Sequence, residues 1–149
     1  MASTYTSIHY HVIWTTFLRK PTLKKEGRKD LFNYLYGILK NKNCHVHRIN
    51  GVEDHLHLAF SLHPSISLAN LVKDMKLASN QMIKSQNLFD AFEGWQEGYG
   101  AFTFGYSSLG DIVNYIINQE EHHKKVSFLE EYVKLLHEHG VSFDPRFLL

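Results

Sequence analysis

The sequence lacks the features that mark several common protein classes. Its single cysteine, Cys44, cannot form an intrachain disulfide and excludes a cysteine-rich zinc site. No apolar run approaches the roughly 20 residues that a membrane helix needs, and residues 1–5 lack the basic and apolar regions of a signal peptide. No Gly-x-x-x-x-Gly-Lys loop for nucleotide phosphates is present. We therefore expect a cytoplasmic protein without a membrane partner.

An excess of charge of one sign is also missing. Lysine and arginine total 16 and acidic residues total 15, so the net charge of +1 does not by itself indicate a nucleic-acid-binding protein. Basic residues are concentrated between Arg19 and Lys29, opposed there only by Glu26; this block can meet phosphates or form an ordinary solvated surface. The surplus is in histidine, with eleven residues, and imidazole is a frequent metal ligand and acid/base group.

The length of 149 residues and the hydrophobic content of 44% favour one domain spanning 1–149. Apolar patterns predict strands at 7–16, 44–49, 55–62 and 101–106, with an Asn50-Gly51 turn between the second and third. Helical spacing predicts helices at 24–42, 67–86, 111–124 and 127–139. This order predicts an α+β, ferredoxin-like split βαββαβ fold: a four-stranded antiparallel sheet with two helices on one face. The other face stays free for a ligand or for the C-terminal helices.

Four His-x-His pairs occur: His9/His11, His45/His47, His55/His57 and His137/His139. Residues i and i+2 share one face of a strand but point about 200° apart on a helix, so the pair predicted on a helix is a poor chelate. The pair at His55 has the cleanest alternation, because Leu56, Leu58 and Phe60 form an apolar face and both histidines take the other. For the remaining two strand pairs we favour structural or substrate-contacting roles.

Tyr115 and Gln119 form a second feature, within the helix predicted at 111–124. Residues four apart lie on one helical face, about 6 Å from each other, so a phenol and a carboxamide can address the same point. Taken alone, Tyr115 also fits an amphipathic residue at the edge of the core. Glu121 and His122 follow and can offer further ligands, or can lie on a solvated helix face.

Together these residues resemble the bacterial insertion-sequence transposases of the single-tyrosine HUH class, where HUH stands for His-hydrophobic-His. His55-Leu56-His57 matches the strand motif, and Tyr115 with Gln119 matches the helix motif of a tyrosine followed four residues later by glutamine. The similarity extends over nearly the whole chain and includes residues 9–16, 19–21, 71–76, 98–102 and 119–123.

The resemblance implies a metal-dependent transposase that cleaves and rejoins single-stranded DNA at insertion-sequence ends. Tyr115, carried by the C-terminal helices, is the implied nucleophile and forms a 5′-phosphotyrosine intermediate. His55, His57 and Gln119 are the implied ligands of one divalent cation, Mg²⁺ or Mn²⁺. Because the phosphotyrosine ester resembles the phosphodiester it replaces, no ATP is required.

The resemblance also implies partners. These are single-stranded DNA, DNA hairpins at the element's ends, and a second copy of the chain in a homodimer, where the tyrosine helix of one subunit can serve the histidines of the other. We assign phosphate contacts to four basic residues: Arg19, Lys20, Lys73 and Lys76.

Other functions stay open at this point. A histidine-triad nucleotide hydrolase needs a third alternating histidine, where this chain has Ala59. A zinc hydrolase would leave Tyr115 without a role. A nucleic-acid-binding module on the same fold would stack bases on aromatic residues, which the segment 102–106 matches only loosely. The nearest alternative is a domesticated or inactive transposase relative that acts as a sequence-specific nucleic-acid-binding protein.

Overall fold

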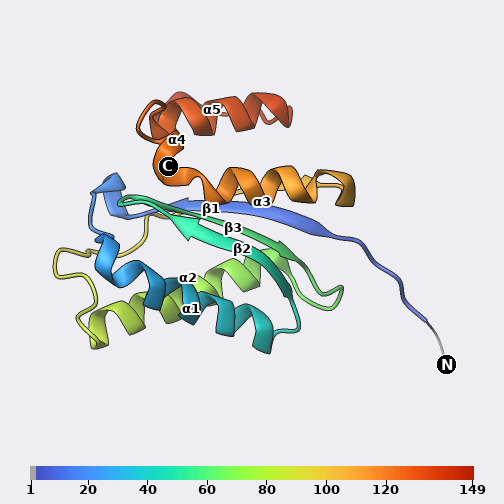
Figure 1. Ribbon diagram of the computed structural model, residues 1–149, viewed down its shortest axis with the longest axis horizontal. Helices are drawn as coiled ribbons and strands as arrows, with labels where there is room; N and C mark the ends of the chain where they lie inside the picture. The colour runs from blue at the N-terminus through green and yellow to red at the C-terminus, as the bar shows by residue number, and fades with distance from the viewer. Residues whose placement is uncertain (1–2) are drawn as a thin grey trace.

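Four antiparallel strands form one sheet in the computed structural model, which describes residues 3–149 (Figure 1). The strands are β1 (His9–Thr15), β2 (His45–Gly51), β3 (His55–Ser61) and β4 (Gly100–Phe104), in the spatial order β2-β3-β1-β4. Helices α1 (Lys25–Asn41) and α2 (Leu68–Ser85) connect the strands and cover one face. The predicted α+β split βαββαβ fold is confirmed.

The main apolar core lies between the sheet and helices α1 and α2. Leu31, Leu35 and Leu39 recur at helical spacing along α1 and are fully buried. The strands contribute the alternate residues that face these helices, and α2 contributes its apolar stripe. The core residues from the two central strands and α2 include Val12, Trp14, Leu56, Leu58, Phe60, Leu71, Val72 and Met75.

Three further helices cover the opposite face of the sheet: α3 (Leu109–Ile117), α4 (Gln119–His122) and α5 (Phe128–Glu138) (Figure 1). A smaller apolar cluster fixes α5 to β1 and β4; its buried members are Ile13, Phe102, Phe128, Tyr132 and Leu136. The face that the sequence left free for a ligand or for C-terminal helices is therefore covered by the helices. Within residues 3–149, none of the helices has the length and apolar character to cross a membrane.

The β2–β3 hairpin differs from its prediction. The Asn50-Gly51 pair belongs to β2, where these residues oppose His57 and Leu56, and the turn comprises residues 52–54. A Cβ on Gly51 would lie 2.6 Å from Leu56 Cδ2 and 2.7 Å from the carbonyl oxygen of His55. Glycine is thus needed here for the close approach of the two strands and not for the turn itself.

The helix predicted at 111–124 is also divided. Helix α3 ends at Ile117 and α4 begins at Gln119, with Asn118 between them at φ −90° and ψ 19°. The side-chain amide of Asn50 donates to the carbonyl oxygens of Ile116 at 2.8 Å and Ile117 at 3.2 Å. Carbonyls at a helix end need such partners, so β2 stabilises the break and fixes the end of α3 above the sheet.

Candidate active site

The histidine pair of β3 lies on the sheet face beneath the C-terminal helices, where both imidazoles are fully buried. His55 Nδ1 donates to Asp54 Oδ1 at 2.6 Å. His57 Nδ1 shares a hydrogen bond of 2.8 Å with Nε2 of His11, from the neighbouring strand β1. These contacts orient both rings, so that each Nε2 points toward α4 and α5.

Burial sets the protonation of these rings. It lowers the pKa of His11 to about 3, helped by the nearby His57. It also lowers the pKa of His57 to about 4, although the contact with Glu131 opposes the shift. Burial acts in the same direction on His55, but hydrogen bonds with Asp54 and Glu131 outweigh it, so the pKa of His55 is raised. Neutral imidazole is the form that binds metal ions.

Tyr115 and Gln119 reach the same site from α3 and α4. The Gln119 side chain is fully buried, and its Nε2 donates to the Tyr115 carbonyl oxygen at 3.4 Å across the helix break. The Tyr115 ring lies edge-on to His57, with 5.9 Å between ring centroids. One chain thus brings together the four residues that sequence analysis proposed for catalysis and metal binding.

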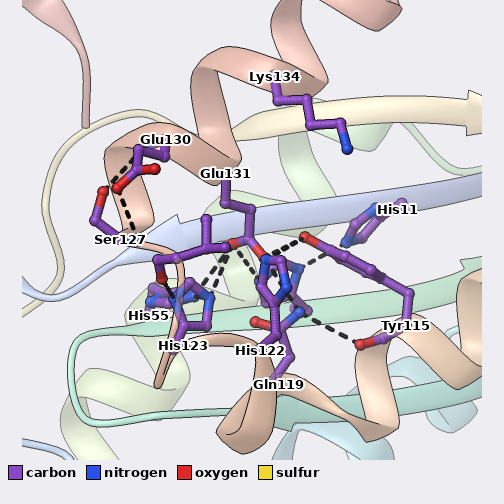
Figure 2. A network of polar contacts seen from close by, with 12 residues as sticks. His11, His55, Tyr115, Gln119, His122, His123, Ser127, Glu130, Glu131 and Lys134 are labelled. Atoms are coloured by element: carbon purple, nitrogen blue, oxygen red, sulfur yellow. Dashed lines mark hydrogen bonds and ion pairs between the residues drawn. The ribbon is translucent and has the colours of Figure 1, made fainter.

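A carboxylate on α5, Glu131, lies at the centre of the site and was not predicted from the sequence (Figure 2). Its Oε1 contacts three imidazole nitrogens: His57 Nε2 at 3.0 Å, His123 Nε2 at 3.2 Å and His55 Nε2 at 3.4 Å. Its Oε2 accepts hydrogen bonds from the Tyr115 hydroxyl and from Gln119 Nε2, and it contacts His122 Nε2 at 3.2 Å. Both sequence motifs therefore meet on one anion.

The surroundings of Glu131 hold it charged and hold Tyr115 neutral. Burial alone would raise the pKa of Glu131, but hydrogen bonds with His123, His55 and His57 outweigh burial and keep that pKa far below its usual range. Burial raises the pKa of Tyr115, and the charge and hydrogen bond of Glu131 raise it further. In this arrangement the phenol keeps its proton and donates it in a hydrogen bond.

The donor atoms in the site suit a metal ion. His55, His57, His123 and Glu131 each offer one ligand atom, and these four atoms lie within 4.8 Å of one another. Gln119 Oε1 is buried and has no hydrogen-bond partner among residues 3–149. A buried polar atom without a partner is costly, and a bound cation would satisfy this one.

A cavity of about 360 Å³ lies beside Tyr115, between α3 and α5. Ile112, Val126 and Leu135 give it apolar walls, and His11 and Lys134 are among its polar lining residues. The cavity gives a ligand room next to the Tyr115 side chain.

The four basic residues proposed for DNA lie in different places. Arg19 is near the site: it lines a small hollow with Asp54 and His123, and its guanidinium lies 5.8 Å from the ring centroid of Phe128. Lys20 forms an ion pair with Glu93. Lys73 and Lys76 are on α2, across the sheet from the site (Figure 1). The Lys76 ammonium donates to the carbonyl oxygens of Gln96 at 2.7 Å and Gly98 at 2.9 Å.

The sequence did contain a signal for Glu131. Phe128, Glu131, Tyr132 and Leu136 form the buried stripe of α5 at helical spacing, so an acidic residue occupies an apolar position. A buried carboxylate requires partners. The acidic residue at an apolar position of the helix would therefore have identified Glu131 as a candidate site residue from the sequence. His123 had no comparable signal, because it lies in a polar run with Glu120, Glu121 and His122.

The family model of IS200-like transposases matches residues 4–119, which include both the histidine pair and the tyrosine-glutamine pair. The chain belongs to the IS200-like transposase family. The resemblance to single-tyrosine HUH transposases is thereby confirmed. His123 and Glu131 lie beyond the segment that matches the transposase model.

Solved structures agree with this assignment. A candidate transposase from Deinococcus radiodurans R1 has a TM-score of 0.60 and 25% identity, over 80% of this chain and 96% of its own. A REP-associated tyrosine transposase bound to a REP hairpin has a TM-score of 0.62 and 12% identity, over 85% of this chain and 76% of its own. The second likeness, at low identity, concerns the transposase fold alone. The curated proteins contain no significant match to this chain.

Proposed function

We propose that this chain is an active transposase that cleaves and rejoins single-stranded DNA at insertion-sequence ends, with Tyr115 as the nucleophile. One observation carries the proposal: the Tyr115 hydroxyl and His57 Nε2 contact the two oxygens of a single carboxylate, Glu131. Phosphate is also an anion with oxygens that accept such contacts. A DNA phosphate in this space would meet both motifs at once.

In the proposed reaction, the Tyr115 oxygen attacks phosphorus and the bond from phosphorus to the 3′-oxygen of the neighbouring nucleotide breaks. The products are a 5′-phosphotyrosine and a 3′-oxygen, which takes up a proton to become a free 3′-hydroxyl. The phenol must lose its own proton as its oxygen attacks, and this release balances the proton that the 3′-oxygen takes up. Attack by another DNA 3′-hydroxyl on the phosphotyrosine reverses these bond changes and joins the strands.

His55, His57 and Gln119 are the proposed ligands of one divalent cation, Mg²⁺ or Mn²⁺. When bound, the cation would polarise the scissile phosphate and offset the charge that grows on its oxygens. The unpaired Oε1 of Gln119 supports its inclusion, because an amide oxygen is a suitable ligand for these ions.

The proposed DNA partners are single strands and hairpins at the element's ends. A hairpin is bound in the structure of the REP-associated relative. Arg19 is well placed to contact phosphates beside the site, and Lys20 can do so if it exchanges Glu93 for DNA. Lys73 and Lys76 would contact DNA that extends to the α2 side of the sheet.

A homodimer remains part of the proposal. In the structure Tyr115 lies beside the histidines of its own chain, and in the proposed dimer it can also serve the histidines of the partner subunit. Mixing a Tyr115→Phe chain with a His57→Ala chain tests exchange between subunits: cleavage by the mixture, and by neither variant alone, is the result expected if sites are shared.

The proposed activity can be tested with labelled single-stranded DNA from the element's end and Mn²⁺. We expect a DNA–protein adduct that survives boiling in detergent. Tyr115→Phe should abolish the adduct and keep hairpin binding in a gel-shift assay, while His57→Ala should impair cleavage. The matched controls are Tyr106→Phe, an exposed tyrosine, and His137→Ala, an exposed histidine; both should form normal adduct.

Two outcomes would contradict the proposal. A normal adduct from Tyr115→Phe would show that the nucleophile is another residue. Hairpin binding without any adduct from the wild-type protein would favour the DNA-binding relative that has lost catalysis.

A further inference from the structure

We infer that His123 and Glu131 join His55 and His57 as ligands of a closed, four-coordinate site for a transition-metal ion of the Zn²⁺, Co²⁺ or Ni²⁺ type. The inference concerns the resting form of the site in the proposed function, with which it shares His55 and His57. It adds two ligands from the C-terminal helical segment and predicts a different metal preference from the open site of His55, His57 and Gln119.

The separations between ligand atoms fit a tetrahedron. Four ligands about 2.0–2.1 Å from one ion in a tetrahedron lie about 3.3–3.4 Å from one another. Glu131 Oε1 lies 3.0, 3.2 and 3.4 Å from Nε2 of His57, His123 and His55. The His55 and His123 Nε2 atoms are 3.1 Å apart. Four ligand atoms have six distances between them. The four distances given above are within a few tenths of an ångström of the expected length, and the other two are below 4.8 Å.

The outer nitrogens of these rings support the same conclusion. His123 Nδ1 donates to the carbonyl oxygen of Val126 at 2.9 Å, and His55 Nδ1 donates to the Asp54 carboxylate. Because neither acceptor has a hydrogen to donate, each Nδ1 must carry the hydrogen of the bond. In the neutral ring Nε2 then has no hydrogen and offers a lone pair. A backbone carbonyl or carboxylate behind each imidazole is the usual support of a metal-binding histidine.

When both rings are neutral, two imidazole lone pairs face each other at 3.1 Å beside an anionic carboxylate. These groups repel one another unless positive charge lies between them. Protonation can supply that charge to one ring at a time, whereas a divalent cation between the four atoms satisfies all of them together.

The chemistry of the ligand set selects the metal. Imidazole nitrogens suit Zn²⁺, Co²⁺ and Ni²⁺, while Mg²⁺ prefers oxygen ligands and retains several waters. The His55, His57 and Glu131 side chains are at most 1% exposed, which leaves little room for such waters. Gln119 Nε2 and the Tyr115 hydroxyl hold the second carboxylate oxygen and so orient Glu131 toward the other ligands.

Cobalt titration of the metal-free protein, without DNA, tests the inference. A four-coordinate Co²⁺ site absorbs visible light strongly, and a six-coordinate site of two histidines, an amide and waters absorbs weakly. We expect the strong spectrum from the wild type, and its loss with at least about 100-fold weaker Co²⁺ binding in Glu131→Gln and His123→Ala. Glu138→Gln on the same helix and His137→Ala are the matched controls and should bind as the wild type does.

X-ray absorption of the zinc-loaded wild type counts the imidazoles without any substitution, and we expect three. Three results would overturn the inference. They are a count of two imidazoles by X-ray absorption, a weak six-coordinate cobalt spectrum of the wild type, and unchanged Co²⁺ affinity in both Glu131→Gln and His123→Ala. If Glu131→Gln does not fold, His123→Ala and the zinc measurement still decide. The cobalt and zinc measurements contain no DNA, so failure of the proposed DNA chemistry is distinguishable from failure of this metal site.

Discussion

The two faces of the sheet are built from the same strands but perform different tasks. On β3, Leu56, Leu58 and Phe60 enter the apolar core against α1 and α2, and His55 and His57 enter the polar site beneath α4 and α5. Burying each large apolar side chain stabilises the fold by about 1.5–3 kcal/mol. Burying polar groups costs free energy unless they are paired.

The polar face is therefore stable only as a network. Most of its buried groups satisfy one another: His11 supports His57, and Glu131 connects His57 with Tyr115 and Gln119. The exception is Gln119 Oε1, which has no partner among residues 3–149. Removing one side chain from the apolar face should reduce stability, whereas loosening the polar face should reduce metal binding and cleavage. The following substitutions separate these two effects.

The largest expected change in stability comes from the apolar face. Leu58→Ala should lower the free energy of unfolding by about 2–5 kcal/mol, because it removes a fully buried side chain and leaves a cavity. Urea unfolding of the metal-free protein measures the change. Leu77→Ala, on the exposed side of α2, is the control and should change it by less than about 0.5 kcal/mol. Equal losses from both would contradict the assigned core.

Two glycines provide a matched pair across the sheet. An added Cβ would lie 2.6 Å from Phe89 at Gly27 and 2.6 Å from Tyr132 at Gly100. Each alanine substitution should cost about 1–3 kcal/mol through overpacking. Only Gly100→Ala should also weaken Co²⁺ binding, because Tyr132 adjoins Glu131 on α5. Equal cobalt affinity in the two variants would show that the position of α5 does not affect metal binding.

The smallest effect is expected at the helix caps. Ser127 caps α5 in a reciprocal capping box with Glu130, and Ser67 caps α2 on the other side of the sheet. Each serine-to-alanine change should cost about 0.5–2 kcal/mol. In thermal unfolding with and without Zn²⁺, Ser127→Ala should reduce the shift in midpoint caused by the metal. A reduced shift in Ser67→Ala instead would argue against a specific link between α5 and the metal.

The sequence predicted the fold because each strand and helix has a local pattern. The strict alternation of apolar and polar residues in β3 assigned Leu56 and His55 to opposite faces of the sheet. Helical spacing located the long helices. The break at Asn118 depends on hydrogen bonds from Asn50, which is distant in the sequence, and no local pattern encodes it. The Asn50-Gly51 pair has the sequence of a turn, but glycine is needed at position 51 because Leu56, on the opposite strand of the hairpin, leaves no space for a side chain. The local sequence does not show this contact.

The site was predictable only in part for the same reason. The pairs His55/His57 and Tyr115/Gln119 have recognisable spacings, but their meeting point is a carboxylate from a helix that follows in the chain. Glu131 could have been selected from its apolar position in α5, whereas its contact with six other side chains required the fold.

The central claim is that Tyr115 and the β3 histidines act on one DNA phosphate. Mass spectrometry of proteolysed adduct, formed with single-stranded DNA and Mn²⁺, tests it most directly. We predict a nucleotide joined through a 5′-phosphate to the peptide that contains Tyr115, and no such peptide from His57→Ala. A phosphate bond to any other residue, or an undiminished Tyr115 adduct in His57→Ala, would contradict the claim.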